Sequence, residues 1–169
     1  NNTIVVKLLL DHGVDPNSHC SGGRTPLMGA LLRDNYSTAQ VLLRRGASAT
    51  ATDNRGLTPI DYLPDDCPSV KRYLSMLMAY GADVNQVDQH GDTALCKTVG
   101  MGYAPLRRKT FAFAIDRMEV LLTKYGADPF KGNVKGHTCL THIGNTKSGD
   151  ATELLLTHTA SYVTHKLLL

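Results

Sequence analysis

Apolar residues recur at helical spacing in several separate stretches of this 169-residue chain. Residues three and four positions apart share one face of an α-helix, so each stretch predicts a helix with one buried face. The clearest groups are Ile4, Val5, Leu8 and Leu9, then Ala39 with Val41, Leu42 and Leu43, and then Val70, Leu74, Leu77 and Met78. The pattern predicts short amphipathic helices separated by turns.

Two turn signals recur between these helices at matching intervals. One is Gly-x-Thr, in which the glycine allows a tight turn and the threonine can cap a following helix. The other is a glycine that ends the preceding helix. The first signal begins at Gly23, Gly56, Gly91 and Gly136, and the second lies at Gly13, Gly46, Gly81 and Gly126. Both series are spaced by 33, 35 and 45 residues, which indicates a chain built from repeats.

These repeats resemble the ankyrin-repeat family, whose unit of about 33 residues opens on the pattern T-P-L-H-x-A. The most regular copies are Thr25-Pro26-Leu27 and Thr58-Pro59-Ile60. The resemblance implies an all-α repeat fold, an ankyrin-like solenoid of stacked helix-turn-helix units with β-turn fingers. It also implies a single ankyrin-repeat domain over residues 1–169. Its units are a partial repeat at 1–19, repeats at 20–52, 53–87 and 88–132, and a C-terminal repeat with its cap at 133–169.

The repeats depart from the family pattern in ways that predict local changes. Met28, Asp61, Cys96 and Thr141 stand where the family has histidine, so the hydrogen bond of that histidine must be replaced or lost. Pro64 lies close behind Pro59, and a proline inside a helix removes a backbone hydrogen bond. The first helix of the 53–87 unit should therefore be short.

The 88–132 unit carries an insertion near residues 99–110. Its glycines, its proline and three consecutive basic residues favour a loop between the two helices, although longer helices are the alternative. Near the end of the chain, Thr159 stands where the helix-ending glycine is expected. Threonine disfavours a left-handed backbone, so we expect a frayed or altered C-terminal cap.

Composition narrows the function classes. The net charge is only +3, and no apolar run reaches the roughly 20 residues of a membrane helix, so neither nucleic acid nor a membrane is expected as a partner. Cys20, Cys67, Cys96 and Cys139 are widely separated, which argues against a disulfide and for reduced thiols. We therefore expect a cytoplasmic protein, with the nucleus as the alternative. The start on Asn1, just before a helix, suggests a fragment of a larger protein.

Candidate metal and catalytic groups lack the spacings that such sites use. His137, Cys139 and His142, with Cys96 one unit earlier, could supply zinc ligands, but no typical partner pair accompanies them. Cys96, His90 and Asp88 could form a nucleophilic site on paper, without a local signature to support it. No phosphate-binding glycine motif occurs. We expect no enzyme activity, no metal, no cofactor and no small-molecule substrate.

The resemblance instead implies a binding surface made by the fingers and first helices, which line a concave face in ankyrin-like stacks. Arginine, histidine and exposed methionine are residue types that interfaces favour. The candidate partner-binding residues are Arg24, Met28, Arg33, Asn54, Arg55, Leu57, Asp65, Asp66, Gln89, His90, Tyr103, Arg107, Arg108, Lys135 and His137. The basic run at 107–109 is too short to indicate nucleic acid and would suit an acidic protein segment.

Asn17 and Asn85 match the turn asparagine that intracellular hydroxylases modify in some similar repeats, although turn formation is their expected role.

The expected function is a non-catalytic scaffold for protein–protein interaction, which binds a protein or peptide through the concave face and fingers. The alternative is a substrate-recruiting or regulatory segment of a multidomain enzyme, such as a ubiquitin-ligase receptor. A third hypothesis, an inhibitor that masks a transcription factor, uses the same surface.

Overall fold

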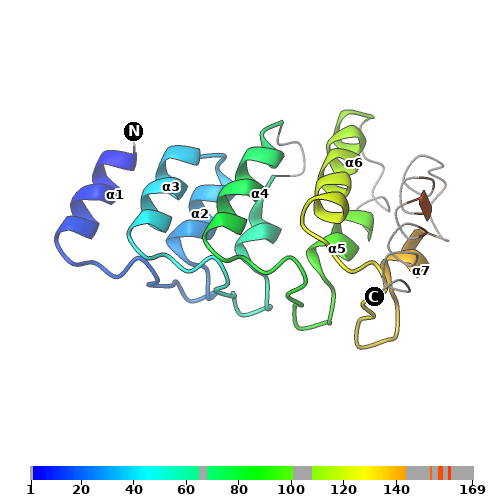
Figure 1. The fold of residues 1–169 in the computed structure, drawn as a ribbon. Coiled ribbons are helices and arrows are strands. Elements are labelled where there is room, and N and C mark those ends of the chain that lie inside the picture. Colours follow the sequence, from blue (N-terminus) through cyan, green and yellow to red (C-terminus); the bar gives the residue numbers. More distant parts are fainter. Residues whose placement is uncertain are drawn as a thin grey trace.

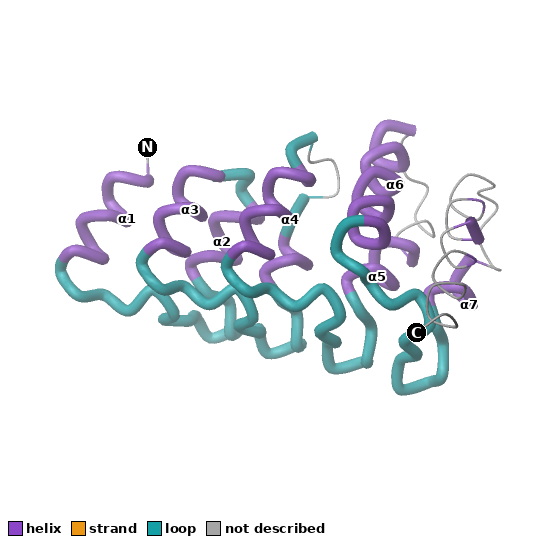
Figure 2. The backbone as a smooth tube through the Cα atoms, in the orientation of Figure 1, coloured by secondary structure: helices purple, strands orange, loops and turns teal. Residues whose placement is uncertain are grey.

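The computed structural model describes residues 2–64, 68–100 and 108–143, together with Glu153, Leu156, Thr157 and Ala160. Short helices in these ranges stand side by side in a row (Figure 1). Long loops extend along one edge of the row (Figure 2). In chain order the helices are α1 (Asn2–Asp11), α2 (Pro26–Leu32), α3 (Tyr36–Arg44), η1 (Pro59–Tyr62), α4 (Val70–Ala79), α5 (Ala94–Gly100), α6 (Arg108–Thr123) and α7 (Cys139–Ile143).

The helices form two layers. The first helices of the units, α2, η1, α5 and α7, make one layer, and the second helices, α1, α3, α4 and α6, make the other. Within a unit α2 packs on α3, η1 on α4 and α5 on α6, while α1–α3, α2–η1, α4–α6 and α5–α7 join neighbouring units. This arrangement confirms the predicted all-α repeat fold.

One apolar core runs through the stack. Leu31 and Leu42 belong to it in one unit, Leu74 and Leu77 in the next, and Leu121 in the third, each almost completely buried. The helical periodicity of α3 and α4 therefore identified their buried faces correctly.

Helix α1 differs from this pattern, because the apolar face predicted from Ile4, Val5, Leu8 and Leu9 is exposed. Ile4 is 64% exposed and Leu9 is 49% exposed. The predicted burial of this face is wrong, because Val6 and Leu10 are the apolar residues of α1 that pack against the core.

Helix η1 is a four-residue 3-10 helix, as the two prolines predicted. Arg117 of α6 compensates for its short length. The Arg117 guanidinium is buried, and it donates to the carbonyl oxygen of Ile60 at 2.5 Å and to that of Leu63 at 3.4 Å. The Ile60 carbonyl also accepts the Leu63 N–H at 3.3 Å, so Arg117 adds donors at the point where η1 ends.

The insertion is helical at both ends. Residues 99 and 100 finish α5, and Arg108 begins α6, which has 16 residues compared with 9 in α3. The predicted loop is therefore wrong for these positions, where the insertion lengthens the helices. Arginine and lysine at 108 and 109 are good helix formers and continue into the amphipathic run of α6. Residues 101–107 and the expected change at Thr159 lie outside the described residues.

The four fingers are residues 20–25, 53–58, 88–93 and 133–138, and we number them 1 to 4. Gly56 of finger 2 has φ +79°, and a Cβ placed on it would lie 2.7 Å from the backbone nitrogen of Gln89 in finger 3. Gly81, which ends α4, has a similar φ of +82° but nothing within 4 Å of such a Cβ. Gly56 therefore meets a conformational and a steric requirement, whereas Gly81 meets only the first.

We expect Gly56→Ala to lower the free energy of unfolding by about 2–4 kcal/mol, and Gly81→Ala by about 1 kcal/mol. Both variants place alanine in the left-handed region, so the difference isolates the contact between fingers. Urea unfolding followed by circular dichroism measures both values. Equal losses would show that finger 3 moves away without cost.

Candidate partner-binding surface

Each of fingers 2 to 4 is held by the side chain of its first residue. The Asp53 Oδ1 atom accepts the backbone N–H groups of Arg55 and Leu57, each at 2.8 Å. Asp88 in finger 3 and Asn133 in finger 4 accept from the residues two and four positions later in the same way. These side chains bend the backbone into the same turn three times, as Asx residues do in tight turns.

Finger 1 has Cys20 at this position. Hydrogen bonds from the backbone of Gly22 and Arg24 stabilise the thiolate and lower the pKa of Cys20. The Cys20 side chain is exposed and is the free cysteine among the described residues.

Backbone hydrogen bonds join each finger to the next. The Asn54 N–H donates to the carbonyl of Gly22 at 3.2 Å. Gln89 donates to Arg55 at 3.0 Å, and Val134 donates to His90 at 3.0 Å. The four fingers therefore form one row with a fixed register.

Other residues replace the hydrogen bond of the missing histidine. The backbone N–H of Thr58 donates to the Asp61 carboxylate at 2.8 Å, and that of Thr138 donates to the Thr141 hydroxyl at 3.0 Å. In the first unit the Met28 sulfur accepts from Thr25 at 3.4 Å. In the third unit Cys96 bonds to another cysteine instead.

A buried ion cluster joins the 53–87 unit to the 88–132 unit. The Lys97 Nζ atom lies 3.0 Å from Asp61 and 3.3 Å from Asp88, whose side chains are only 5% and 6% exposed. It also donates to the carbonyl of Asp92 at 3.2 Å. The sequence pattern did not reveal the role of Lys97, because its carboxylate partners lie 36 and 9 residues earlier in the chain.

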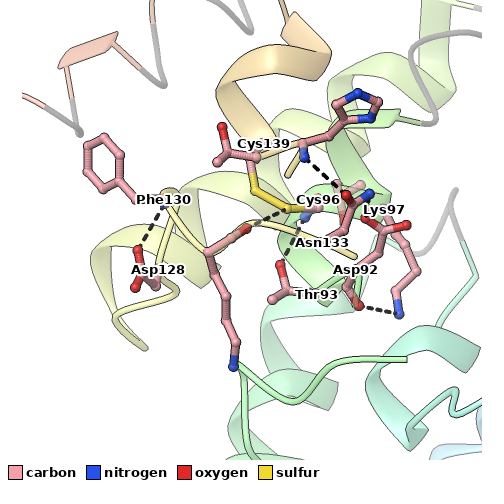
Figure 3. The surroundings of a disulfide bond; sticks show 12 residues. Asp92, Thr93, Cys96, Lys97, Asp128, Phe130, Asn133 and Cys139 are labelled. Carbon is pink, nitrogen blue, oxygen red and sulfur yellow. Dashed lines mark hydrogen bonds between the residues drawn. A yellow bond between two sulfur atoms is a disulfide. The ribbon is translucent and has the colours of Figure 1, made fainter. Parts of the chain in front are cut away.

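Cys96 and Cys139 form a disulfide between α5 and α7 (Figure 3). The prediction that the cysteines remain unpaired is therefore wrong. Their separation of 43 residues in sequence becomes a Cα–Cα distance of 4.5 Å, because the two cysteines lie at the starts of first helices in adjacent units. The recurrence of Thr93 and Thr138 just before them is the signal that could have revealed the pair.

This bond also involves residues of the two alternative chemistries. It joins two of the four candidate zinc ligands, and no cluster of three or more metal-ligating side chains occurs among the described residues. The structure does not assemble Cys96, His90 and Asp88 into the nucleophilic site considered from the sequence. The Cys96 sulfur is bonded to Cys139, while the Asp88 carboxylate accepts from the His90 backbone and from Lys97.

The carboxyl groups of Asp53 and Asp88 have altered acidity. Burial by itself would raise the pKa of Asp53, but the Leu57 N–H, the Tyr62 hydroxyl and Arg55 stabilise the charged form and hold this pKa below its ordinary value. The same balance lowers the pKa of Asp88, where burial is outweighed by backbone N–H groups and Lys97. Burial and the hydrogen bond to Asp53 raise the pKa of Tyr62.

Most of the predicted binding residues that the structure describes lie at the surface. Leu57 is partly buried, and Arg24 and Arg33 line one groove of about 460 Å³ between finger 1 and α2. The exposed residues are Arg24, Arg33, Asn54, Arg55, Gln89, His90, Lys135 and His137.

Met28 was wrongly predicted to be an exposed contact. It is completely buried, because its sulfur turns inward to the Thr25 N–H and its side chain fills the core beside α2. Asp65, Asp66, Tyr103 and Arg107 lie outside the described residues, and Arg108 is described only as the first residue of α6.

The two turn asparagines bridge adjacent units. Asn17 donates to the carbonyl of Gly46 at 3.0 Å and accepts from the Ser48 N–H at 2.8 Å. Asn85 makes the equivalent contacts to Gly126 and Asp128. Both side chains therefore position the following loop, in line with the turn role expected from the sequence.

Residues 1–63 match the family model described as "Ankyrin repeats (many copies)". This match places residues 1–63 in the ankyrin-repeat family, and the later units have the same stacked fold. Ankyrin repeats are protein–protein interaction modules, and members of the family are typically non-catalytic.

Similar ankyrin regions occur in much longer proteins. The chain is 38% identical over 90 residues to neurogenic locus notch homolog protein 2 of Homo sapiens, a match that covers 53% of this chain and 4% of that protein. It is 41% identical over 58 residues to the ADP-ribosylation factor GTPase-activating protein AGD2 of Arabidopsis thaliana, covering 34% of this chain and 8% of that protein. It is 30% identical over 107 residues to the glycerophosphocholine phosphodiesterase gde1 of Schizosaccharomyces pombe, covering 63% of this chain and 9% of that protein.

This ankyrin-repeat chain thus spans less than a tenth of each of these relatives. In the part of the chain that the structure describes, no helix is long and apolar enough to cross a membrane.

The lowered pKa of Asp53 predicts a loss of stability in acid. A carboxyl group with a depressed folded-state pKa stabilises the fold above its unfolded pKa of about 3.9, and this contribution is lost as the pH falls through the folded value. Asp53→Asn keeps an acceptor oxygen, as Asn133 does in finger 4, but removes the charge. We expect this variant to lose about 1–2 kcal/mol at pH 7 and to show a smaller difference in unfolding free energy between neutral and acid pH. Urea titrations at several pH values measure this difference, and an unchanged acid profile would contradict the assignment.

Removing the Lys97 ammonium should destabilise the protein because it leaves two buried carboxylates without their cation. We expect Lys97→Met to cost about 2–3 kcal/mol in urea unfolding, and Asp61→Asn with Asp88→Asn to recover part of the loss in that background. The control is Lys71→Met, whose ion pair with Asp116 has side chains 61% and 49% exposed and should contribute less than about 1 kcal/mol. Equal costs for Lys97→Met and Lys71→Met would contradict the importance of the buried cluster.

Proposed function

We propose that this chain is a non-catalytic module that binds a protein or peptide partner through its fingers and first helices. The observation that carries the proposal is the row of fingers, which are joined by backbone hydrogen bonds and carry exposed polar side chains in a fixed register. A preformed surface loses little conformational entropy when a partner binds, so its contacts contribute more fully to affinity.

The charge distribution supports this surface as the interface. Arg24 and Arg33 line one groove at finger 1, and Arg55 projects from finger 2 with 64% of its side chain exposed. Arginine is among the residue types enriched in interface hot spots. The buried carboxylates of the fingers hold the turns and pair with Lys97, so they are not part of this exposed surface.

In this proposal the chain is the recognition part of a larger protein of the cytoplasm or nucleus and does not act on a small molecule, nucleic acid or membrane. The similar regions belong to relatives more than ten times as long as the matched segments, which supports a role in recruitment. A substrate-recruiting or regulatory segment of a multidomain enzyme would use the same surface. The matched proteins support this alternative only because their ankyrin regions are parts of longer chains.

Charge reversal should separate binding from folding. We expect the triple variant Arg24→Glu, Arg33→Glu and Arg55→Glu to weaken a partner, first identified by affinity purification and mass spectrometry and then purified, by at least about tenfold. Isothermal titration calorimetry gives the affinity, and thermal melting shows whether the fold is kept.

The matched control reverses three exposed cations on second helices or at their ends, with Lys7→Glu, Arg44→Glu and Lys124→Glu. This control should bind within about twofold of the unaltered protein. Unchanged affinity of the finger variant for a verified partner would overturn the assignment of the site.

A further inference from the structure

Three consecutive fingers present a basic residue at their tips. Arg55, His90 and Lys135 each precede the finger glycine, and all three are exposed. We call these three residues the tip row. In finger 1 the equivalent residue is Gly22, so the row begins at finger 2.

The finger-to-finger hydrogen bonds fix the backbone of the tip row. The carbonyl of Arg55 itself accepts the Gln89 N–H, and the carbonyl of His90 accepts the Val134 N–H, each at 3.0 Å. A Cβ on Gly56 or Gly91 would collide with the next finger, so these glycines permit the close approach. The three basic side chains therefore extend from a single rigid edge, one from each finger.

The carboxylates of the same fingers face inward. Asp53 and Asp88 have side chains only 3% and 6% exposed. Their oxygens are occupied by backbone N–H groups, and also by the Tyr62 hydroxyl in one case and by Lys97 in the other. Asp92 is partly buried and accepts from Asn133 at 2.9 Å.

A partner at the edge would therefore meet cations before it meets carboxylates. Asp53 offsets part of the Arg55 charge, since its Oδ2 lies 3.4 Å from Nε. A guanidinium has five N–H donors, so its interactions with Asp53 and Tyr62 leave others for a ligand. The Lys135 ammonium has no ion-pair partner among the described residues.

The neighbours of the tip row favour a protein ligand over a nucleic acid. Val134 lies beside Lys135 and is 74% exposed, and the partly buried Leu57 follows Gly56. None of the four fingers contains Phe, Tyr or Trp, the rings on which single-stranded nucleic acids are usually held by stacking. An exposed aliphatic side chain beside basic ones complements a segment that carries aliphatic and acidic residues.

We propose that the tip row binds an extended acidic segment of a protein partner, with its carboxylates against Arg55, His90 and Lys135 and an aliphatic side chain against Val134. Carboxylate contacts to arginine and lysine are charge-assisted and are stronger than neutral hydrogen bonds. This inference rests on the proposed function above and adds the chemical class of the ligand.

The test uses the whole chain and a short fluorescein-labelled peptide of Glu, Val and Ser, with fluorescence anisotropy as the readout. The same peptide with Gln in place of Glu tests the need for charge, and a labelled oligothymidylate tests nucleic acid. We expect the Glu peptide to bind at least about tenfold more tightly than the Gln peptide, and more weakly as salt is raised.

The variant Arg55→Gln with Lys135→Gln should weaken the Glu peptide at least about tenfold. The control Lys7→Gln with Arg44→Gln removes the same charge from second helices and should change the affinity less than about twofold. Circular dichroism melts of both variants confirm folding. A further variant, His90→Gln, keeps an uncharged donor at the middle tip. If the row acts along its whole length, this variant should lose affinity for the Glu peptide, but less than the double variant does.

Three outcomes would overturn the inference. These are equal affinity for the Glu and Gln peptides, equal losses in the tip-row and control variants, or tighter binding of the oligothymidylate than of the Glu peptide. If a verified protein partner still depends on the reversed arginines while the two peptides bind alike, the proposed function stands and only the acidic ligand class fails. If that partner ignores the reversed arginines while the Glu peptide requires the tip row, the broader binding surface fails instead.

Discussion

The close approach of one finger to the next is the constraint on which the described surface depends. Each contact needs a glycine with positive φ, because Gly56 and Gly91 face the backbone of the following finger at distances that no Cβ could occupy. The hydrogen bonds from Gln89 and Val134 then set the register. Since no helix pair of this size buries a core alone, the stacking that brings the fingers together is also the stacking that buries the leucines.

Polar groups are distributed according to the same constraint. The fingers need carboxylates or an amide to hold their turns, and these acceptors must lie inside, next to the backbone N–H groups. Burying them is costly unless cations or further donors compensate, and Lys97, Tyr62 and Arg55 do so. Arg55 and the other basic side chains of the fingers lie at the exposed edge. The separation of inward acids from outward bases thus follows from turn chemistry rather than from a net charge, which is only +3 for the whole chain.

The irregular repeats show how other contacts, both within and between units, replace the regular repeat pattern. Pro64 shortens the first helix of the second unit, and Arg117, 53 residues later, donates to the carbonyls of Ile60 and Leu63 at its end. Where histidine is absent, a sulfur, a carboxylate and a hydroxyl accept the same threonine N–H. Asn17 and Asn85 clamp the following loops, so their side chains already have structural partners.

The sequence by itself determined the repeat, its helices and the finger positions, because glycine, threonine and proline act locally and recur at a fixed interval. It also determined the short η1, since the effect of a proline on a helix does not depend on distant residues. Only the tertiary structure decided what depends on stacking: the Cys96–Cys139 bond, the Lys97 cluster, the burial of Met28 and the exposure of α1. Those features join residues far apart in the chain or depend on which neighbour covers a face. Local periodicity predicts neither.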